Sequence, residues 1–107
     1  MKHSAEYYIE HLEMEPHVEG GYFKECLLEK EERNLWSSIY FMLAKGEVSH
    51  FHRLKSDEVW YYHDGNALTI YMIDEAGKLT AAKLGLDLEK GEVPQVLVPK
   101  GMIFGSA

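Results

Sequence analysis

The residues best suited to chemistry are two histidines and a glutamate, His50, His52 and Glu58, which lie close together in residues 46–65, GEVSHFHRLKSDEVWYYHDG. This segment is typical of two strands joined by a turn, and alternate side chains of a strand share a face. His50 and His52 are therefore expected on one face, about 7 Å apart along the backbone. Both imidazoles could then bind one metal ion, and Glu58 on the returning strand would supply the carboxylate of a divalent transition-metal site.

Glu58 also suits proton transfer. Together with Trp60 and Tyr62 it occupies alternate positions of the returning strand, and the three side chains are expected on one inward face. A buried carboxylate has to be paired or protonated. Glu58 is therefore either an acid–base group or one half of a structural ion pair with Arg53 or Lys24.

An imidazole beside a carboxylate is oriented and made more basic, which favours general-base chemistry. His52 with Asp57 or Glu58 can form such a dyad. Tyr62 is a candidate proton donor beside it, and Tyr40 and Tyr71 are alternatives that no motif separates from it.

Other side chains suit the binding of a polar ligand. Arg53 and Lys24 carry the charge needed to hold a phosphate or a carboxylate. Trp60 and Tyr71 are expected in strands, where aromatic rings either pack in the core or form walls for sugar rings and nucleobases. The remaining histidines are expected at the surface; they are His3, His11, His17 and His63.

The elements that position these residues are mostly strands. Ser4 is a candidate N-cap for one short helix within the first dozen residues, and Pro16 ends its pattern. Short apolar runs rich in Tyr, Ile, Val, Phe and Trp follow, separated by turn residues, which indicates an antiparallel sandwich or barrel. The strands are expected at 22–28, 35–43, 48–54, 59–62, 68–73, 79–84 and 95–98.

Length and charge limit the function further. The chain has 107 residues, enough for a single domain, and 18 acidic against 11 basic residues give a formal charge of −7. That balance disfavours nucleic acid and anionic membrane as partners, since both require clustered Lys and Arg. Cys26 is the single cysteine and no signal peptide is visible, so a reducing, cytoplasmic location is expected.

The central segment resembles the first motif of the cupin superfamily, which has a glycine, a His-x-His pair, a glutamate and, after six residues, a second glycine. More narrowly, the chain resembles small cupins with a dTDP-sugar-epimerase-like jelly roll. EPHVEGGYFKE at 15–25, SSIYFML at 37–43, SHFHRLKSDEVWYYHDG at 49–65 and LGLDLEKGEVPQVLVPKGMIFGSA at 84–107 carry this resemblance.

The resemblance implies an all-β, cupin-type antiparallel jelly roll (a double-stranded β-helix) with a short N-terminal helix. It implies a small-molecule pocket for a sugar, a nucleotide-sugar or a related polar metabolite, with proton transfer of the isomerase or epimerase type as the candidate reaction. The alternatives are a metal-dependent cupin enzyme and a binding or structural module without catalysis.

Departures from the cupin pattern weaken the metal hypothesis. Five residues separate His52 from Glu58, where cupins usually have three or four. Regular spacing returns if His52 takes the first histidine's place, which puts Leu54 at the second. The later cupin motif has Phe104 where a histidine is usual. We therefore expect no cofactor and no tightly held metal; a divalent transition metal on His50, His52 and Glu58 is the alternative.

The resemblance also bears on domain organisation. Residues 1–107 are expected to form one cupin domain that lacks the C-terminal strands usual in this branch. Unpaired strand edges and an open core favour a partner surface, and cupins of this kind commonly pair. A homodimer is therefore expected.

Overall fold

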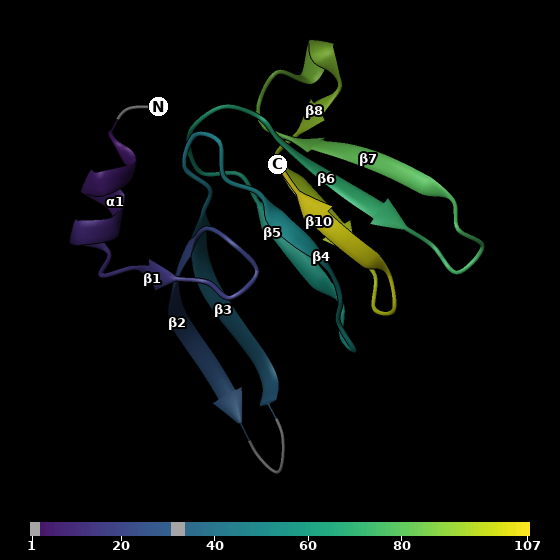
Figure 1. The fold of residues 1–107 in the computed structure, drawn as a ribbon, viewed down its shortest axis with the longest axis horizontal. Coiled ribbons are helices and arrows are strands. Elements are labelled where there is room, and N and C mark those ends of the chain that lie inside the picture. The colour runs from purple at the N-terminus through teal and green to yellow at the C-terminus, as the bar shows by residue number, and fades with distance from the viewer. Residues whose placement is uncertain (1–2, 31–33) are drawn as a thin grey trace. The chain divides into compact units, whose positions relative to one another are not determined.

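The computed structural model of the chain describes residues 3–30 and 34–107, which contain one α-helix, one 3-10 helix and ten strands (Figure 1). This mostly-β content with a single short N-terminal helix agrees with the prediction from the sequence. The strands belong to two compact units, His3–Glu47 and residues 48–107. Each unit is considered by itself below. No helix among the described residues is long and apolar enough to cross a membrane.

The first unit begins with helix α1 (Ala5–His11). Ser4 caps it as predicted, because its hydroxyl accepts a hydrogen bond from the Tyr7 backbone N–H at 3.1 Å. The helix ends at Leu12, and Glu13 then takes the left-handed conformation with φ of 53°. This is the C-terminal turn in which glycine is more usual.

A three-stranded antiparallel sheet completes this unit, in the order β1-β2-β3, from β1 (Glu15–Pro16), β2 (Tyr22–Lys30) and β3 (Asn34–Met42). Gly21 precedes β2 with φ of 77°, and a Cβ atom there would lie 2.5 Å from the Met42 carbonyl oxygen. Only glycine fits this close approach without strain.

His17, in the turn between β1 and β2, is half-buried rather than at the surface. Its Nδ1 atom accepts a hydrogen bond from the Glu19 backbone N–H at 3.0 Å. Its ring makes edge-on contacts with Phe23 and Phe41, with centroid distances of 5.1 and 5.6 Å. The imidazole therefore serves as a fixed part of this turn.

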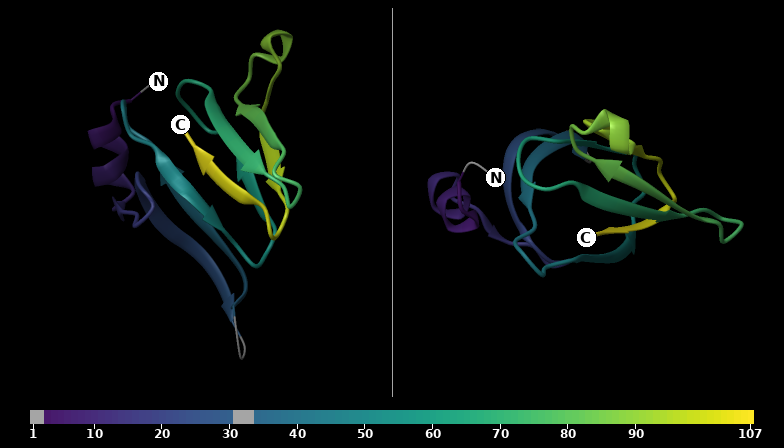
Figure 2. Two further views of the ribbon diagram at one scale, coloured as in Figure 1. Left: turned by 45° about the vertical axis from the view of Figure 1, so that its right-hand side comes forward. Right: turned by 90° about the horizontal axis from the view of Figure 1, so that it is seen from above.

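The second unit contains a five-stranded and a two-stranded sheet. In the larger sheet β10 runs between β4 and β6 (Figure 2), and only the β7–β8 pair is parallel. Its order is β4 (Ser49–Arg53), β10 (Ile103–Ser106), β6 (Leu68–Ile73), β7 (Leu79–Leu84) and β8 (Glu92–Val93). The smaller sheet pairs β5 (Glu58–Tyr61) with β9 (Gln95–Val98), and the 3-10 helix η1 (Leu88–Lys90) precedes β8.

The core of the second unit is shared by its two sheets. One cluster joins buried side chains of the larger sheet to those of β9, and it consists of Ile70, Met72, Leu84, Val96, Val98 and Phe104. Partly buried side chains of β5 and its continuation, Trp60 and Tyr62, pack against this cluster. The inner faces of β5 and β10 therefore border the same core as those of β6, β7 and β9.

Candidate functional site

Strand β4 contains a β-bulge at the position that decides where its histidines point. Phe104 of β10 pairs with His52, whereas Ser106, two residues further on, pairs with Ser49, three residues back. One strand therefore has an extra residue in this stretch. Gly105 lies opposite the bulge, where a Cβ atom would be 2.9 Å from the Ser49 carbonyl oxygen.

The bulge breaks the alternation of faces along β4. Ser49 is 6% exposed and His52 is half-buried, while His50 and Phe51 between them are both exposed. The prediction that His50 and His52 share a face is wrong for this reason. Strict alternation fails wherever a strand carries an extra residue.

His52 is held on the inner face with a defined orientation. Its ring lies 4.4 Å from the Phe104 ring, centroid to centroid. Its Nδ1 atom lies 2.8 Å from the His50 carbonyl oxygen. Because a carbonyl can only accept, Nδ1 carries the hydrogen, and the neutral ring leaves Nε2 as a proton acceptor.

Glu58 enters the same inner face from β5. It pairs with Val98, which is 1% exposed, and Trp60 pairs with Val96 in the same register. Burial raises the pKa of Glu58 above its usual 4.5, and attraction to His52 in its charged form offsets only part of that rise. The Oε2 atom of Glu58 is shielded from solvent and has no hydrogen-bond partner among the described residues.

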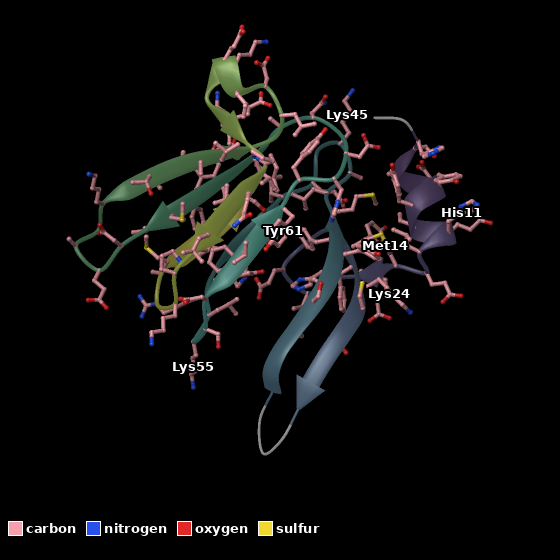
Figure 3. All side chains as sticks on the ribbon, turned by 180° about the vertical axis from the view of Figure 1, so that it is seen from behind. His11, Met14, Lys24, Lys45, Lys55 and Tyr61 are labelled. Atoms are coloured by element: carbon pink, nitrogen blue, oxygen red, sulfur yellow. The ribbon has the colours of Figure 1, made fainter. Side chains whose placement is uncertain are left out.

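Asp57 and Tyr62, the other two predicted catalytic residues, have local contacts. Asp57 accepts a hydrogen bond from the Lys100 backbone N–H at 2.8 Å and so joins the β4–β5 turn, at whose tip Lys55 lies (Figure 3), to the β9–β10 turn. The Tyr62 hydroxyl donates to the Gly65 carbonyl oxygen at 2.7 Å. Of the two carboxylates considered as a partner for His52, Glu58 is the one whose charge interaction with it is found.

Arg53 and Tyr71 lie on the opposite face of the larger sheet from Phe104. Arg53 is exposed and pairs with Ile103, and Tyr71 pairs with Gly105. Directly opposed residues of neighbouring strands share a face. Ile103 and Gly105 are the immediate neighbours of Phe104 in β10, so both pairs point to the face opposite Phe104. The structure therefore does not bring these two predicted ligand-binding side chains to His52 and Glu58.

Trp60 and Lys24 are the remaining predicted ligand-binding residues. Trp60 is half-buried on the inner face, against the core. Lys24 belongs to the first unit, where its ammonium lies 3.8 Å from the Glu13 carboxylate; Figure 3 shows it on β2. Of these two, only Trp60 lies in the unit that contains His52 and Glu58.

The residues present do not fit a metal centre of the cupin type. His50, the second predicted imidazole ligand, lies on the exposed side of the bulge. Phe104 occupies the position opposite His52. In the part of the chain that the structure describes, no three His, Cys, Asp or Glu side chains converge closely enough to hold an ion.

Two buried serines of the inner face, Ser49 and Ser106, were not predicted from the sequence. Ser106 is 3% exposed, and its Oγ atom has no hydrogen-bond partner within the described chain. It pairs with Ser49 on one side and with Ile70 on the other, so it shares the inner face with Phe104. No strand was expected at 103–106; the alternation of Phe104 and Ser106 after the Gly101 turn was the available signal.

Comparisons with known proteins agree with this architecture. A family model described as "Cupin superfamily (DUF985)" matches residues 6–107. The chain is similar to the crystal structure of protein SO0799 from Shewanella oneidensis, with 58% identity, a TM-score of 0.93, and coverage of 98% of this chain and 69% of that one. It is also similar to a hypothetical protein from Leishmania major, with 36% identity, a TM-score of 0.87, and coverage of 98% and 70%. Among curated proteins no similar sequence was found.

Proposed function

The chain belongs to the cupin superfamily, and we propose that it binds a polar small molecule against the inner face that carries His52 and Glu58. The proposed ligand class is a sugar, a nucleotide-sugar or a related polar metabolite. The observation that supports this most strongly is the Oε2 atom of Glu58, which is buried and has no protein partner within the described residues. The carboxyl group also interacts by charge with His52, whose ring is oriented by the His50 carbonyl oxygen.

A buried polar atom without a partner is costly. Such a group destabilises a folded protein by about 1–3 kcal/mol, and native structures contain few of them. A ligand hydroxyl that donates to Glu58 would remove this cost. The aromatic ring of Trp60, half-buried on the same face, offers the kind of apolar wall that sugar rings use.

The pair His52 and Glu58 also suits proton transfer of the isomerase or epimerase type. When the His52 ring is neutral, its Nε2 atom can accept a proton from the ligand. When the Glu58 carboxyl group is protonated, a form that burial favours because it raises the pKa, it can donate a proton to the ligand. The ligand then keeps its net charge, and the products of the transfer are an imidazolium and a carboxylate that attract each other.

Binding without catalysis is the second candidate function. The hydroxyl of Tyr62 is hydrogen-bonded to the Gly65 carbonyl oxygen, and Asp57 is bonded to the Lys100 backbone. Tyr62 and Asp57, which were predicted to assist His52 in proton transfer, are therefore both hydrogen-bonded elsewhere. This favours a site that binds a ligand without catalysis. A metal-dependent reaction is not proposed, because the side chains present do not fit the ion.

The test is a thermal-shift screen with neutral monosaccharides, sugar phosphates and nucleotide-sugars. We expect at least one class to raise the melting temperature of the wild-type protein and of Glu75→Gln, which changes an exposed carboxylate in the β6–β7 turn. The rise should be lost in His52→Ala and in Glu58→Gln. A rise that survives both of these substitutions would contradict the proposed site.

Proton transfer is tested separately with the ligand found by that screen. Incubation in deuterated water should exchange a carbon-bound hydrogen of the ligand, and NMR of the ligand would detect the loss of its signal. Exchange that stops in His52→Ala supports catalysis. Tight binding without any exchange would assign the protein to the binding class.

A homodimer in a reducing, cytoplasmic compartment belongs to the same proposal. The outer face of β5 and β9 exposes an apolar cross-strand pair, Val59 and Leu97, at 41% and 52%, beside Tyr61 at 60% (Figure 3). Association of two copies would remove such a surface from water. Sedimentation equilibrium at micromolar concentration should give twice the monomer mass, and a compact, cooperatively folded monomer would contradict the dimer.

A further inference from the structure

Two buried polar atoms mark separate positions on the inner face of the second unit. One is Oε2 of Glu58, beside His52, and the other is Oγ of Ser106. His52 is level with Phe104 in the β4–β10 pairing, and Ser106 lies two residues beyond Phe104 on β10. Two residues of a strand correspond to about 7 Å, so Ser106 lies about 7 Å along β10 from the level of His52.

The charges around these positions decide what kind of ligand fits. The unit has six basic residues outside its histidines. Arg53 and Lys83 belong to strands but lie on the outer face. Arg53 pairs with Ile103, the neighbour of buried Phe104, and Lys83 precedes buried Leu84. The others lie in turns, in loops or in η1, and they are Lys55, Lys78, Lys90 and Lys100.

The inner face described in this unit therefore presents a carboxyl group and hydroxyls, with an imidazole but no Lys or Arg. A phosphate group placed there would meet Glu58 without a guanidinium or ammonium of this unit to neutralise it. Ionised Glu58 would repel the phosphate as a like charge at a desolvated site, so Glu58 would have to take up a proton before the phosphate could bind. A hydroxyl group, by contrast, can donate to Glu58 and either donate to or accept from Ser106.

Resting on the proposed function, we infer that the ligand is an uncharged, hydroxyl-bearing ring of monosaccharide size, and that Ser106 is a specificity-determining residue for it. One ligand hydroxyl donates to Oε2 of Glu58, and a second polar group bonds to Oγ of Ser106. Phosphorylated and nucleotide-linked sugars are excluded from the inferred ligand class.

The substitution Ser106→Ala should have different effects on the stability of the ligand-free protein and on its affinity for the ligand. Without ligand the buried hydroxyl has no partner among residues 3–30 and 34–107, so its removal leaves the melting temperature unchanged or raises it. With ligand the same substitution removes a hydrogen bond. The expected loss is about five-fold in affinity, the equivalent of about 1 kcal/mol for one neutral hydrogen bond.

The experiment titrates the wild-type protein, Ser106→Ala and Ser56→Ala with D-glucose, D-galactose, D-mannose and L-rhamnose and with their 1-phosphates, and it follows amide NMR signals. Ser56→Ala is the control, because Ser56 is an exposed serine of the β4–β5 turn. Melting temperatures of the three ligand-free proteins are measured alongside. We expect at least one neutral sugar to bind ten-fold more tightly than its 1-phosphate, with weakening in Ser106→Ala only.

Several results would overturn the inference. If the 1-phosphates bind as tightly as the neutral sugars, or if Ser106→Ala binds like the wild type, the inference fails while polar-ligand binding at His52 and Glu58 stands. If Ser106→Ala melts well below Ser56→Ala without ligand, the hydroxyl has a structural partner and the inference fails without reference to any ligand. If neither the sugars, nor their 1-phosphates, nor nucleotide-sugars shift the amide NMR signal of His52, the proposed function itself fails.

Discussion

The substitution Glu58→Gln removes a desolvated carboxylate from the inner face and should change how stability depends on pH. Burial raises the pKa of Glu58 in the folded protein above its usual 4.5. The folded state therefore binds this proton more tightly than the unfolded chain does, and stability is lost as the pH rises from about 4.5 through the folded value. Below about pH 4.5, Glu58 is protonated in both the folded and the unfolded protein, and it causes no loss of stability.

The size of the effect follows from the surroundings of the carboxyl group. Its Oε2 atom is buried without a partner within the described residues, and its cross-strand neighbour Val98 is 1% exposed. A buried group in that state costs about 1–3 kcal/mol. Glutamine keeps the shape and the polar atoms but loses the charge, so we expect a gain of about 1 kcal/mol at neutral pH, or about 4 °C in melting temperature for a chain of this size.

The assay is thermal unfolding of wild-type protein, Glu58→Gln and the exposed control Glu75→Gln between pH 4 and pH 8. The difference between Glu58→Gln and wild type should be small at pH 4 and should grow with rising pH to a plateau. The control should stay within about 0.5 kcal/mol of wild type throughout. A Glu58→Gln protein that is less stable than wild type at neutral pH would refute the reasoning, because it would show that the carboxylate is well paired.

Three further predictions concern the core, a glycine and metal content. Phe104→Ala should lower the free energy of unfolding by about 3–5 kcal/mol in urea titrations, because the ring is 1% exposed; a loss below about 1 kcal/mol would contradict the assigned core. Gly21→Ala should destabilise the protein more than Gly77→Ala. Both glycines have positive φ, but only at Gly21 would the added Cβ atom meet a carbonyl oxygen, whereas a Cβ atom at Gly77 would have nothing within 4 Å. Equal melting temperatures of the two variants would contradict this. Elemental analysis of protein purified without added metal should give well under one equivalent of Mn, Fe, Ni or Zn, and about one equivalent that disappears in His52→Ala would contradict the absence of a metal role.

Much of the fold could be predicted because the signals are local. The runs at 68–73, 79–84 and 95–98 appear as strands β6, β7 and β9 with the predicted bounds. The cap at Ser4 forms because a serine hydroxyl before a helix satisfies a free backbone N–H. The strands β1 and β8 escaped prediction, because two residues do not make a periodic pattern. The strand β10 escaped it because it contains Gly105, and glycine is depleted in strands.

The candidate site was predicted only where alternation holds. Glu58 and Trp60 point inward as expected, because β5 pairs with β9 without a register shift. His50 was placed with His52 in error, because an extra residue in β4 rotates one of them away, and it is the pairing with β10 that reveals the bulge. Ser106 was missed because its importance depends on burial and on the lack of a partner, which only the packed structure reveals.

The most direct test of the proposed binding site is a crystal structure of the protein soaked with the strongest ligand from the thermal-shift screen. Ligand density is expected on the inner face, with a ligand hydroxyl at hydrogen-bond distance, about 2.5–3.2 Å, from Oε2 of Glu58 and a ligand atom facing Nε2 of His52. Ligand bound elsewhere, with Oε2 of Glu58 bonded to a protein side chain that fills the space beside it, would contradict the account.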